Sequence, residues 1–480
     1  MPTGYSLRCT VGEVAVLFNS YSFVLIFLPL VLLGWWGLRA RVHRLLFLTL
    51  VSYLFYAWWD FRFVPLMILS TSADYAAGRA IALSRSASRR TTLLVLLLIF
   101  NLGILAVFKY YDFFVGSLEG LGRLLGYHPE WPLLQVLLPV GISFYTFNSI
   151  SYTIDVYRGK LAPARSFLEF SAFVAMFPHL VAGPIVRYAD MARQFETLRV
   201  RPRPAEWVTG LWMFAIGMAK KVLVADVVAR GLVDPLWSQA STLDAAGAWL
   251  AALGYTVQIY FDFSGYSDMA VGLALLLGFR FPQNFDSPYQ SSSIGEFWRR
   301  WHMSLSFWLR DYLYIPLGGS RGSALLVGRN LLLTMLLGGL WHGAAWIFVL
   351  WGLYHGALLA GNSYLARLGW VPRSRPLAVA ATFLSVVVGW VVFRARSVTE
   401  ALAMLGSMSG LRSPESGSLH LVDPWAIVLT GSALAICFFA PNTWQLRFPR
   451  TRLAAALLAA LVVACILRFA QPTPFVYFQF

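Results

Sequence analysis

Long apolar runs recur along the chain, separated by short basic connections. The first run, at residues 17–38, reads LFNSYSFVLIFLPLVLLGWWGL and is long enough to cross a bilayer core as a helix. Inside a bilayer no water is available to the backbone, so spanning segments must satisfy their own hydrogen bonds, as helices do. Because 58% of the 480 residues are hydrophobic and only 12% are charged, an ordinary soluble protein is excluded. We expect an all-α, polytopic membrane protein of about twelve transmembrane helices plus re-entrant or interfacial helices.

Basic residues concentrate in the connections between these runs. Arg39, Arg41 and Arg44 follow the first run, and more arginines occupy residues 85–90, whereas the turn at Asp60 is nearly neutral. Cytoplasmic loops of membrane proteins carry such an excess of basic residues. The net charge of +16 therefore indicates contact with a lipid bilayer, and no nucleic-acid partner is expected. This orientation predicts an N-terminus outside the cell membrane, which in a bacterium is the periplasmic side of the inner membrane.

Two segments depart from regular spanning helices. Residues 167–195 are apolar but contain Pro178 and a Gly-Pro pair, and such breaks survive at membrane depth only inside protein or beside water. We expect a re-entrant or interfacial segment there, with His179 satisfying broken backbone. Residues 280–329 form a long cytoplasmic or interfacial segment. The apolar region at residues 331–365 fits either one tilted helix or two short ones.

The 280–329 segment contains an amphipathic stretch. Between Phe297 and Tyr312 bulky side chains recur every three or four residues, which is the period of one helix face. The same period places four polar residues on the opposite face: Arg299, His302, Ser306 and Arg310. We expect one helix that lies at the membrane interface or lines a polar cavity.

Three titratable residues lie within apolar runs. His342 is a candidate functional residue because ionisable side chains are costly in a membrane, and imidazole accepts a proton near neutral pH without a permanent charge. Asp262 and Asp268 are costly there unless they are paired or face water. They could orient a histidine, bind an acceptor, or form an ion pair with an arginine of the 297–312 stretch.

Four longer patterns occur together in this chain. They are MFPHLVAGPIVRY (176–188), QIYFDFSGYSDMAVGLALLLGF (258–279), PQNFDSPYQSSSIGEFWRRWHMSLSFWLRDYLYIPLGG (282–319) and GGLWHGAAWIFVLWGLYHG (338–356). With the LFNS opening and the FVYFQF ending, they resemble the bacterial branch of the membrane-bound O-acyltransferase family, and most closely its alginate-acetylating members. The resemblance covers nearly the whole chain and implies one membrane domain at residues 17–480. Family members start just before LFNS, so we interpret residues 1–16 as an N-terminal extension. Within it, Val16 is the expected initiator, and Met1 to Ala15 would come from a wrongly assigned start codon.

The resemblance also implies an activity. It implies an O-acyltransferase in which His342 is catalytic and His302 is the second signature residue. The implied reaction passes an acetyl group from a cytoplasmic thioester, acetyl-CoA, across the membrane for O-acetylation of an exported polysaccharide, most closely alginate. A periplasmic acetyltransferase partner protein would complete the transfer, and no permanently bound cofactor is implied.

Several residues keep alternative interpretations. Arg299, Arg300 and Arg310 are candidates for binding the phosphates of coenzyme A, because guanidinium groups offer paired donors. Interfacial arginines beside tryptophan also anchor lipid headgroups. His302 would equally suit a bracing role in the cytoplasmic segment.

The function has alternatives as well. Cellulose or peptidoglycan could replace alginate as the acceptor, and related enzymes transfer D-alanine to teichoic acid. A transporter or channel, in which buried histidines relay protons, is the alternative from a different class. The cysteines, histidines and carboxylates show no metal-ligand spacing, so no metal site is predicted.

Overall fold

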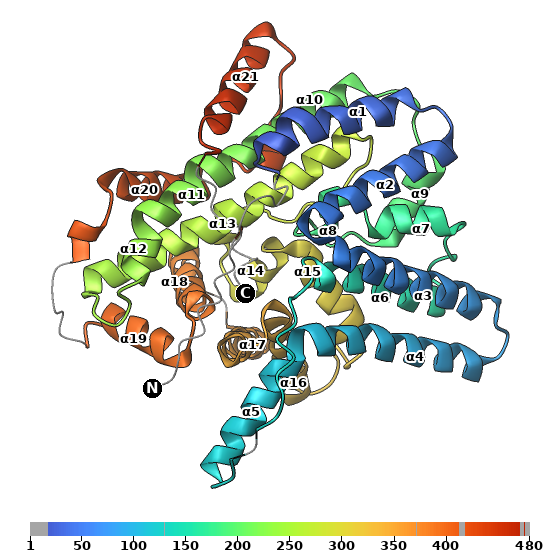
Figure 1. The fold of residues 1–480 in the computed structure, drawn as a ribbon. Coiled ribbons are helices and arrows are strands. Elements are labelled where there is room, and N and C mark those ends of the chain that lie inside the picture. Colours follow the sequence, from blue (N-terminus) through green and yellow to red (C-terminus); the bar gives the residue numbers. More distant parts are fainter. Residues whose placement is uncertain (1–17, 129, 371, 412–417, 471–474, 476–480) are drawn as a thin grey trace.

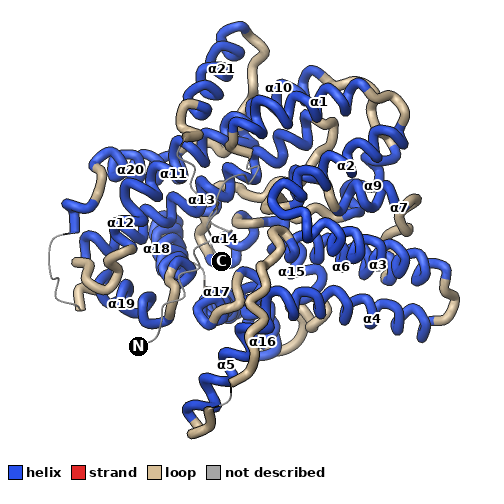
Figure 2. The backbone as a smooth tube through the Cα atoms, in the orientation of Figure 1, coloured by secondary structure: helices blue, strands red, loops and turns tan. Residues whose placement is uncertain are grey.

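Helices form the whole described architecture. The computed structural model describes residues 18–128, 130–370, 372–411, 418–470 and 475, and this part of the chain contains no strand (Figure 2). The predicted all-α class is confirmed. Residues 1–16, where we expect an extension, lie outside the described residues, as does most of the FVYFQF ending.

The first half of the chain begins with helices α1 to α9. Their bounds are α1 (Leu28–Gly37), α2 (Arg41–Asp60), α3 (Val64–Leu83), α4 (Ala87–Leu105), α5 (Tyr111–Leu124), α6 (Ile142–Tyr157), α7 (Phe167–Val174), α8 (Phe177–Leu180) and α9 (Tyr188–Glu196). Wide π-turns are η1 (Phe23–Phe27) and η3 (Ala106–Tyr110), and η2 (Phe61–Phe63) is a 3-10 turn. The segment at 167–195 is broken into the short helices α7 to α9, as its prolines and glycine predict.

The rest of the chain forms helices α10 to α21. Their bounds are α10 (Pro204–Ala219), α11 (Asp226–Val228), α12 (Asp234–Trp237), α13 (Ala245–Leu276), α14 (Ile294–Arg300), α15 (Met303–Leu309), α16 (Ala324–His342), α17 (Trp346–Arg367), α18 (Arg375–Arg394), α19 (Val398–Met408), α20 (Pro424–Phe439) and α21 (Arg452–Ile466). The π-turns here are η4 (Lys220–Ala225), η5 (Ala229–Val233) and η7 (Arg310–Tyr314), and the 3-10 turns are η6 (Pro288–Gln290), η8 (Ser418–Leu421) and η9 (Thr443–Gln445).

Helix α13 lies at the centre of the molecule, with α10 along one side of it (Figure 1). Nearly all of α13 from Tyr255 to Leu276 is buried. Two glycine pairs allow the close approach, because a Cβ on Gly217 would overlap the carbonyl oxygen of Gly265, and one on Gly210 would overlap that of Gly272. Small residues at such crossings let helix backbones pack directly against each other.

The amphipathic stretch at 297–312 is not one helix, so that prediction is wrong. Helix α14 ends at Arg300, α15 begins at Met303, and the π-turn η7 follows. At the break His302 adopts a left-handed conformation (φ 43°, ψ 53°). The break moves His302 out of the polar face and into the interior, where it is only 1% exposed. Periodicity alone could not reveal this, because a single left-handed residue resets the direction of the chain.

The region at 331–365 forms two helices, which settles the choice left open by the sequence. Helix α16 ends at His342 and α17 begins at Trp346, and the two pack as a hairpin. A Cβ on Gly339 would overlap the carbonyl oxygen of Phe348, and one on Gly352 would overlap that of Met335. The hairpin therefore requires glycine at these two contact positions.

Three stretches of the described chain are long and apolar enough to cross a membrane: Ala87–Leu124, Ala324–His342 and Arg375–Arg394. Four shorter apolar helical stretches are Phe23–Gly37, Val398–Met408, Pro424–Phe439 and Arg452–Ile466. Large apolar side chains on α4 face outward, among them Leu96 and Ile99, which is the pattern of a lipid-facing helix. The count of about twelve crossings stays a prediction.

Candidate active site

His342 is the last residue of α16. The chain leaves the helix at Gly343, which has extended backbone angles (φ −160°, ψ 149°). Only glycine fits there, because a Cβ would overlap the ring of Phe348. The imidazole of His342 is 8% exposed and packs edge-to-face against Trp351, with ring centroids 5.1 Å apart. Burial among aromatic rings gives this histidine a dry environment at a helix end.

His302 is held by the side chain of Asn284. The Nδ1 of His302 lies 3.1 Å from Oδ1 of Asn284, and that same oxygen accepts hydrogen bonds from the backbone N–H and the hydroxyl of Ser304 at 3.3 and 2.9 Å. The backbone N–H of Met303 donates to the backbone carbonyl of Asn284 at 2.9 Å. Asn284 therefore fixes the first residues of α15 as well as the imidazole.

These contacts select one tautomer of His302. The oxygen of Asn284 faces the backbone N–H of Ser304, which can only donate, so Oδ1 is the acceptor and the Nδ1 of His302 carries the proton. The other ring nitrogen, Nε2, then bears a lone pair. Within the described part of the chain this buried Nε2 has no hydrogen-bond partner. Burial lowers the pKa of His302 to about 3, so the ring is neutral at physiological pH and its Nε2 can accept a hydrogen bond.

The structure brings the two histidines to the same aromatic ring. Trp341 contacts both, with its ring centroid 6.2 Å from that of His302 and 5.0 Å from that of His342. Phe263 of α13 closes the other side of His302, at 4.7 Å edge-to-face. Two residues forty positions apart in the sequence thus share one buried site.

The three arginines have local contacts at the surface. Arg300 pairs with Glu296 at 3.0 Å, and Arg310 pairs with Asp311 at 2.7 Å. Arg299 is exposed. The ion pairs and hydrogen bonds described for these side chains include neither histidine, so the structure does not bring them into the buried site.

The two aspartates of α13 are paired with lysines of η4. Asp262 lies 2.7 Å from the Nζ of Lys221, which also binds Asp226 at 2.8 Å. Asp268 lies 2.6 Å from the Nζ of Lys220 and accepts a hydrogen bond from Thr443. The aspartates do form ion pairs, but the predicted partner, an arginine of the 297–312 stretch, is wrong. Helix α13 packs beside α10 and η4, so the lysines of η4 are the cations that lie next to its carboxylates.

Two residues near the histidines escaped the sequence analysis. Asn284 lies in a loop without periodicity, and its sequence signal is its place in the 282–319 pattern. Lys109 is different, because it is a lone basic residue inside the apolar run of α4 and α5, and such a residue is a functional candidate. His179 meets its prediction, since its Nε2 lies 3.0 Å from the backbone oxygen of Phe173 in the broken segment.

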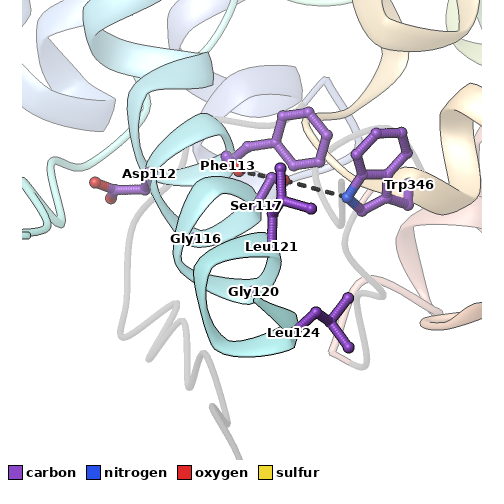
Figure 3. Close-up of a pocket in the computed structure, with 8 residues that line it drawn as sticks. All are labelled: Asp112, Phe113, Gly116, Ser117, Gly120, Leu121, Leu124 and Trp346. Carbon is purple, nitrogen blue, oxygen red and sulfur yellow. Dashed lines mark hydrogen bonds between the residues drawn. The ribbon is translucent and has the colours of Figure 1, made fainter. Parts of the chain in front are cut away.

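A groove of about 580 Å³ lies between α5 and the start of α17 (Figure 3). Trp346 lies on one side of it and the glycines of α5 on the other. The indole N–H of Trp346 donates to the hydroxyl of Ser117 at 3.1 Å, the contact drawn in Figure 3. Among the described residues, no group of three or more metal-ligating side chains could hold a metal ion.

Comparison with known proteins gives this site a family. Residues 164–397, which contain both histidines, match the membrane-bound O-acyltransferase family. The chain is 48% identical to the probable alginate O-acetylase AlgI of Azotobacter vinelandii, over 82% of this chain and 78% of that protein. It belongs to the membrane-bound O-acyltransferase family. The predicted O-acyltransferase activity and membrane character are thereby confirmed. The alternative interpretation as a non-enzymatic transporter or channel is therefore excluded.

Other members of the family align over similar lengths. The probable alginate O-acetylase AlgI of Pseudomonas putida is 42% identical over 97% of this chain and all of that protein. The peptidoglycan O-acetyltransferase of Helicobacter pylori is 38% identical over 82% of this chain and 80% of that protein. This membrane-bound O-acyltransferase is therefore similar to enzymes named for two different polymers.

Proposed function

We propose that this membrane-bound O-acyltransferase transfers acetyl groups to an exported polysaccharide, with His342 as the catalytic base. The observation that carries the proposal is the meeting of His302 and His342 on Trp341, in a site closed by aromatic side chains. The similarity to alginate O-acetylases over most of the chain makes alginate the first choice of polymer. Peptidoglycan is the second choice, because of the similarity to the Helicobacter enzyme.

The reaction follows from the chemistry of a thioester. Acetyl-CoA, the proposed donor, enters from the cytoplasmic side, where residues 280–329 lie in the proposed topology. His342 takes the proton of an acceptor hydroxyl as its oxygen attacks the acetyl carbon. The C–S bond breaks as the C–O bond forms, and the proton passes to the departing thiolate of coenzyme A. Atoms and charges balance without a metal or redox group.

His302 has a supporting role in this proposal. Its Nε2 bears a lone pair held in place through Asn284, so it can accept a hydrogen bond from the donor, the acceptor or His342. Arg299 and Arg310, which lie at the surface, would meet the phosphates of coenzyme A before the thioester enters. Arg300 and Arg310 already pair with the carboxylates of Glu296 and Asp311, so Arg299 is the first of the three to test for this role.

The surrounding arrangement is also part of the proposal. The chain would lie in a bacterial inner membrane with its N-terminus in the periplasm, as the basic connections predict. The acceptor hydroxyl at the far side of the site would belong to the polymer or to a periplasmic acetyltransferase partner that carries the acetyl group onward. Asp262 and Asp268 would keep η4 against α13 and take no part in the chemistry.

The test is the O-acetyl content of the exported polysaccharide in a deletion strain. Complementation with the wild-type gene should restore acetylation, whereas His342→Ala should abolish it and His302→Ala should lower it strongly. His43→Ala is the matched control, because His43 lies exposed on α2 and should behave as wild type. Membrane levels of each variant must be equal. Full acetylation by His342→Ala would overturn the catalytic assignment.

A further inference from the structure

The end of α16 leaves carbonyl groups without helical partners. In a continuous helix the carbonyls of Leu340, Trp341 and His342 would accept from the N–H groups four residues later, but the helix stops at His342. Such orphan groups at a buried helix end need other donors. Their donors also decide how rigidly the last turn, and with it His342, is held.

Donors for these carbonyls come from the π-turn η3. The hydroxyl of Tyr110 donates to the carbonyl of Leu340 at 2.9 Å. The ammonium group of Lys109 donates to the carbonyl of Trp341 and lies 3.5 Å from that of His342. It also lies 3.5 Å from the hydroxyl of Ser143. Lys109 thus lies at the carbonyl end of α16, where the helix dipole favours a cation.

The backbone of η3 explains how neighbouring side chains reach consecutive carbonyls. A π-turn widens the helix locally and re-aims the side chains on it, and such turns are frequent at functional sites. Helix α5 continues from η3 and meets the residues that follow His342, since Phe113 packs on Trp346 with ring centroids 5.5 Å apart. One element, from η3 through α5, thus contacts Leu340 and Trp341 before His342 and Trp346 after it. Figure 3 shows the contact with Trp346.

We propose that Lys109, supported by Tyr110, is a positioning residue for His342. Its ammonium group fixes the last turn of α16 and so sets the direction in which the imidazole projects. The inference rests on the proposed function of His342 and adds a residue from a segment more than two hundred positions away. No substrate contact of Lys109 is required. A shift of about 1 Å in a reacting group can cost a factor of about 100 in rate, so a displacement of a fraction of an ångström should cost about tenfold or more.

The test uses the full-length protein purified in lipid nanodiscs, with acetyl-CoA as the donor and release of free coenzyme A as the signal. Lys109→Met keeps the length of the side chain and removes its donors, and it should lower kcat by about tenfold or more with little change in KM. Lys109→Arg should retain most of the activity because it keeps the charge and the donors. Val107→Met is the matched control, because Val107 lies in the same π-turn and is 48% exposed.

A double variant separates positioning from general destabilisation. If Lys109 acts through His342, Lys109→Met should add nothing to the loss caused by His342→Ala, whereas independent effects would multiply. Wild-type kcat in Lys109→Met, or a full additional loss in the double variant, would overturn the inference while the proposed function stands. Wild-type turnover by His342→Ala would overturn both. If Lys109→Met fails to accumulate, Tyr110→Phe tests the same support of the last turn of α16, because it removes the hydroxyl that donates to the carbonyl of Leu340.

Discussion

The Nδ1 of His302 and the Oδ1 of Asn284 lie 3.1 Å apart, inside the protein and at a break between two short helices. This contact defines which ring nitrogen of His302 can accept a hydrogen bond. It also explains why a histidine tolerates left-handed backbone angles, because Asn284 binds the residues on which the new helix begins. Strain of this kind persists where surrounding contacts outweigh its cost.

Replacing Asn284 should therefore impair acyl transfer. Asn284→Ala removes the acceptor that selects the tautomer of His302 and leaves the Ser304 donors unsatisfied, so activity should fall by about 10- to 100-fold. The unfolding free energy should fall by about 1–3 kcal/mol. Release of coenzyme A and thermal unfolding in nanodiscs measure the two effects. Gln283→Ala, which alters the preceding residue, is the control. Unchanged activity in Asn284→Ala would contradict the role given to the tautomer.

The pH dependence of stability should reveal the burial of His302. Its folded-state pKa of about 3 lies below the ordinary value of 6.5, so between these values the unfolded chain binds a proton that the folded chain does not. Stability is therefore fully present above pH 6.5 and is lost as the pH falls through this window. The loss is at most about 1.4 kcal/mol per pH unit. The stability of His302→Gln should depend less steeply on pH between 6.5 and 4 than that of the wild type, and equal slopes would count against a neutral, buried His302.

The α16–α17 hairpin should not tolerate a side chain at its closest contact. Gly339→Ala places a methyl group against the carbonyl oxygen of Phe348, so it should destabilise the protein by about 1–3 kcal/mol and displace His342. Gly361→Ala in α17 is the control, since a Cβ there meets nothing within 4 Å. It should match or slightly exceed the wild type in melting temperature. Equal stability of the two variants would show that the hairpin packs differently.

Breaking the ion pairs of Lys221 with Asp262 and Asp226 should lower the stability of the protein more than its catalytic rate. Lys221→Met leaves Asp262 and Asp226 without their shared cation, which at a buried site costs about 3–5 kcal/mol. Membrane levels and melting temperature should fall, whereas kcat per folded molecule should stay near the wild-type value. Lys160→Met, on the exposed surface, should change neither. A variant that is stable but inactive would instead give the network a role in catalysis.

The sequence determined the properties that depend on local pattern. Apolar runs of spanning length fixed the helical membrane class, because a chain in lipid must satisfy its own backbone groups. Prolines predicted the breaks between the short helices α7 to α9. The four motifs that carry the family resemblance identified His302 and His342 as candidate site residues. These features follow from residue types and short spacings, so they can be found without knowing how the helices pack.

Tertiary structure decided how those pieces meet. It placed His302 at a helix break, chose Lys220 and Lys221 as partners of the α13 carboxylates, and brought Lys109 to the end of α16 from another part of the chain. The residues in these contacts lie far apart in the sequence, where hydrophobic periodicity predicts no pairing. They depend on which buried donors and acceptors come within about 3 Å after packing, because unpaired polar groups in the interior are costly. Only the folded chain sets those distances.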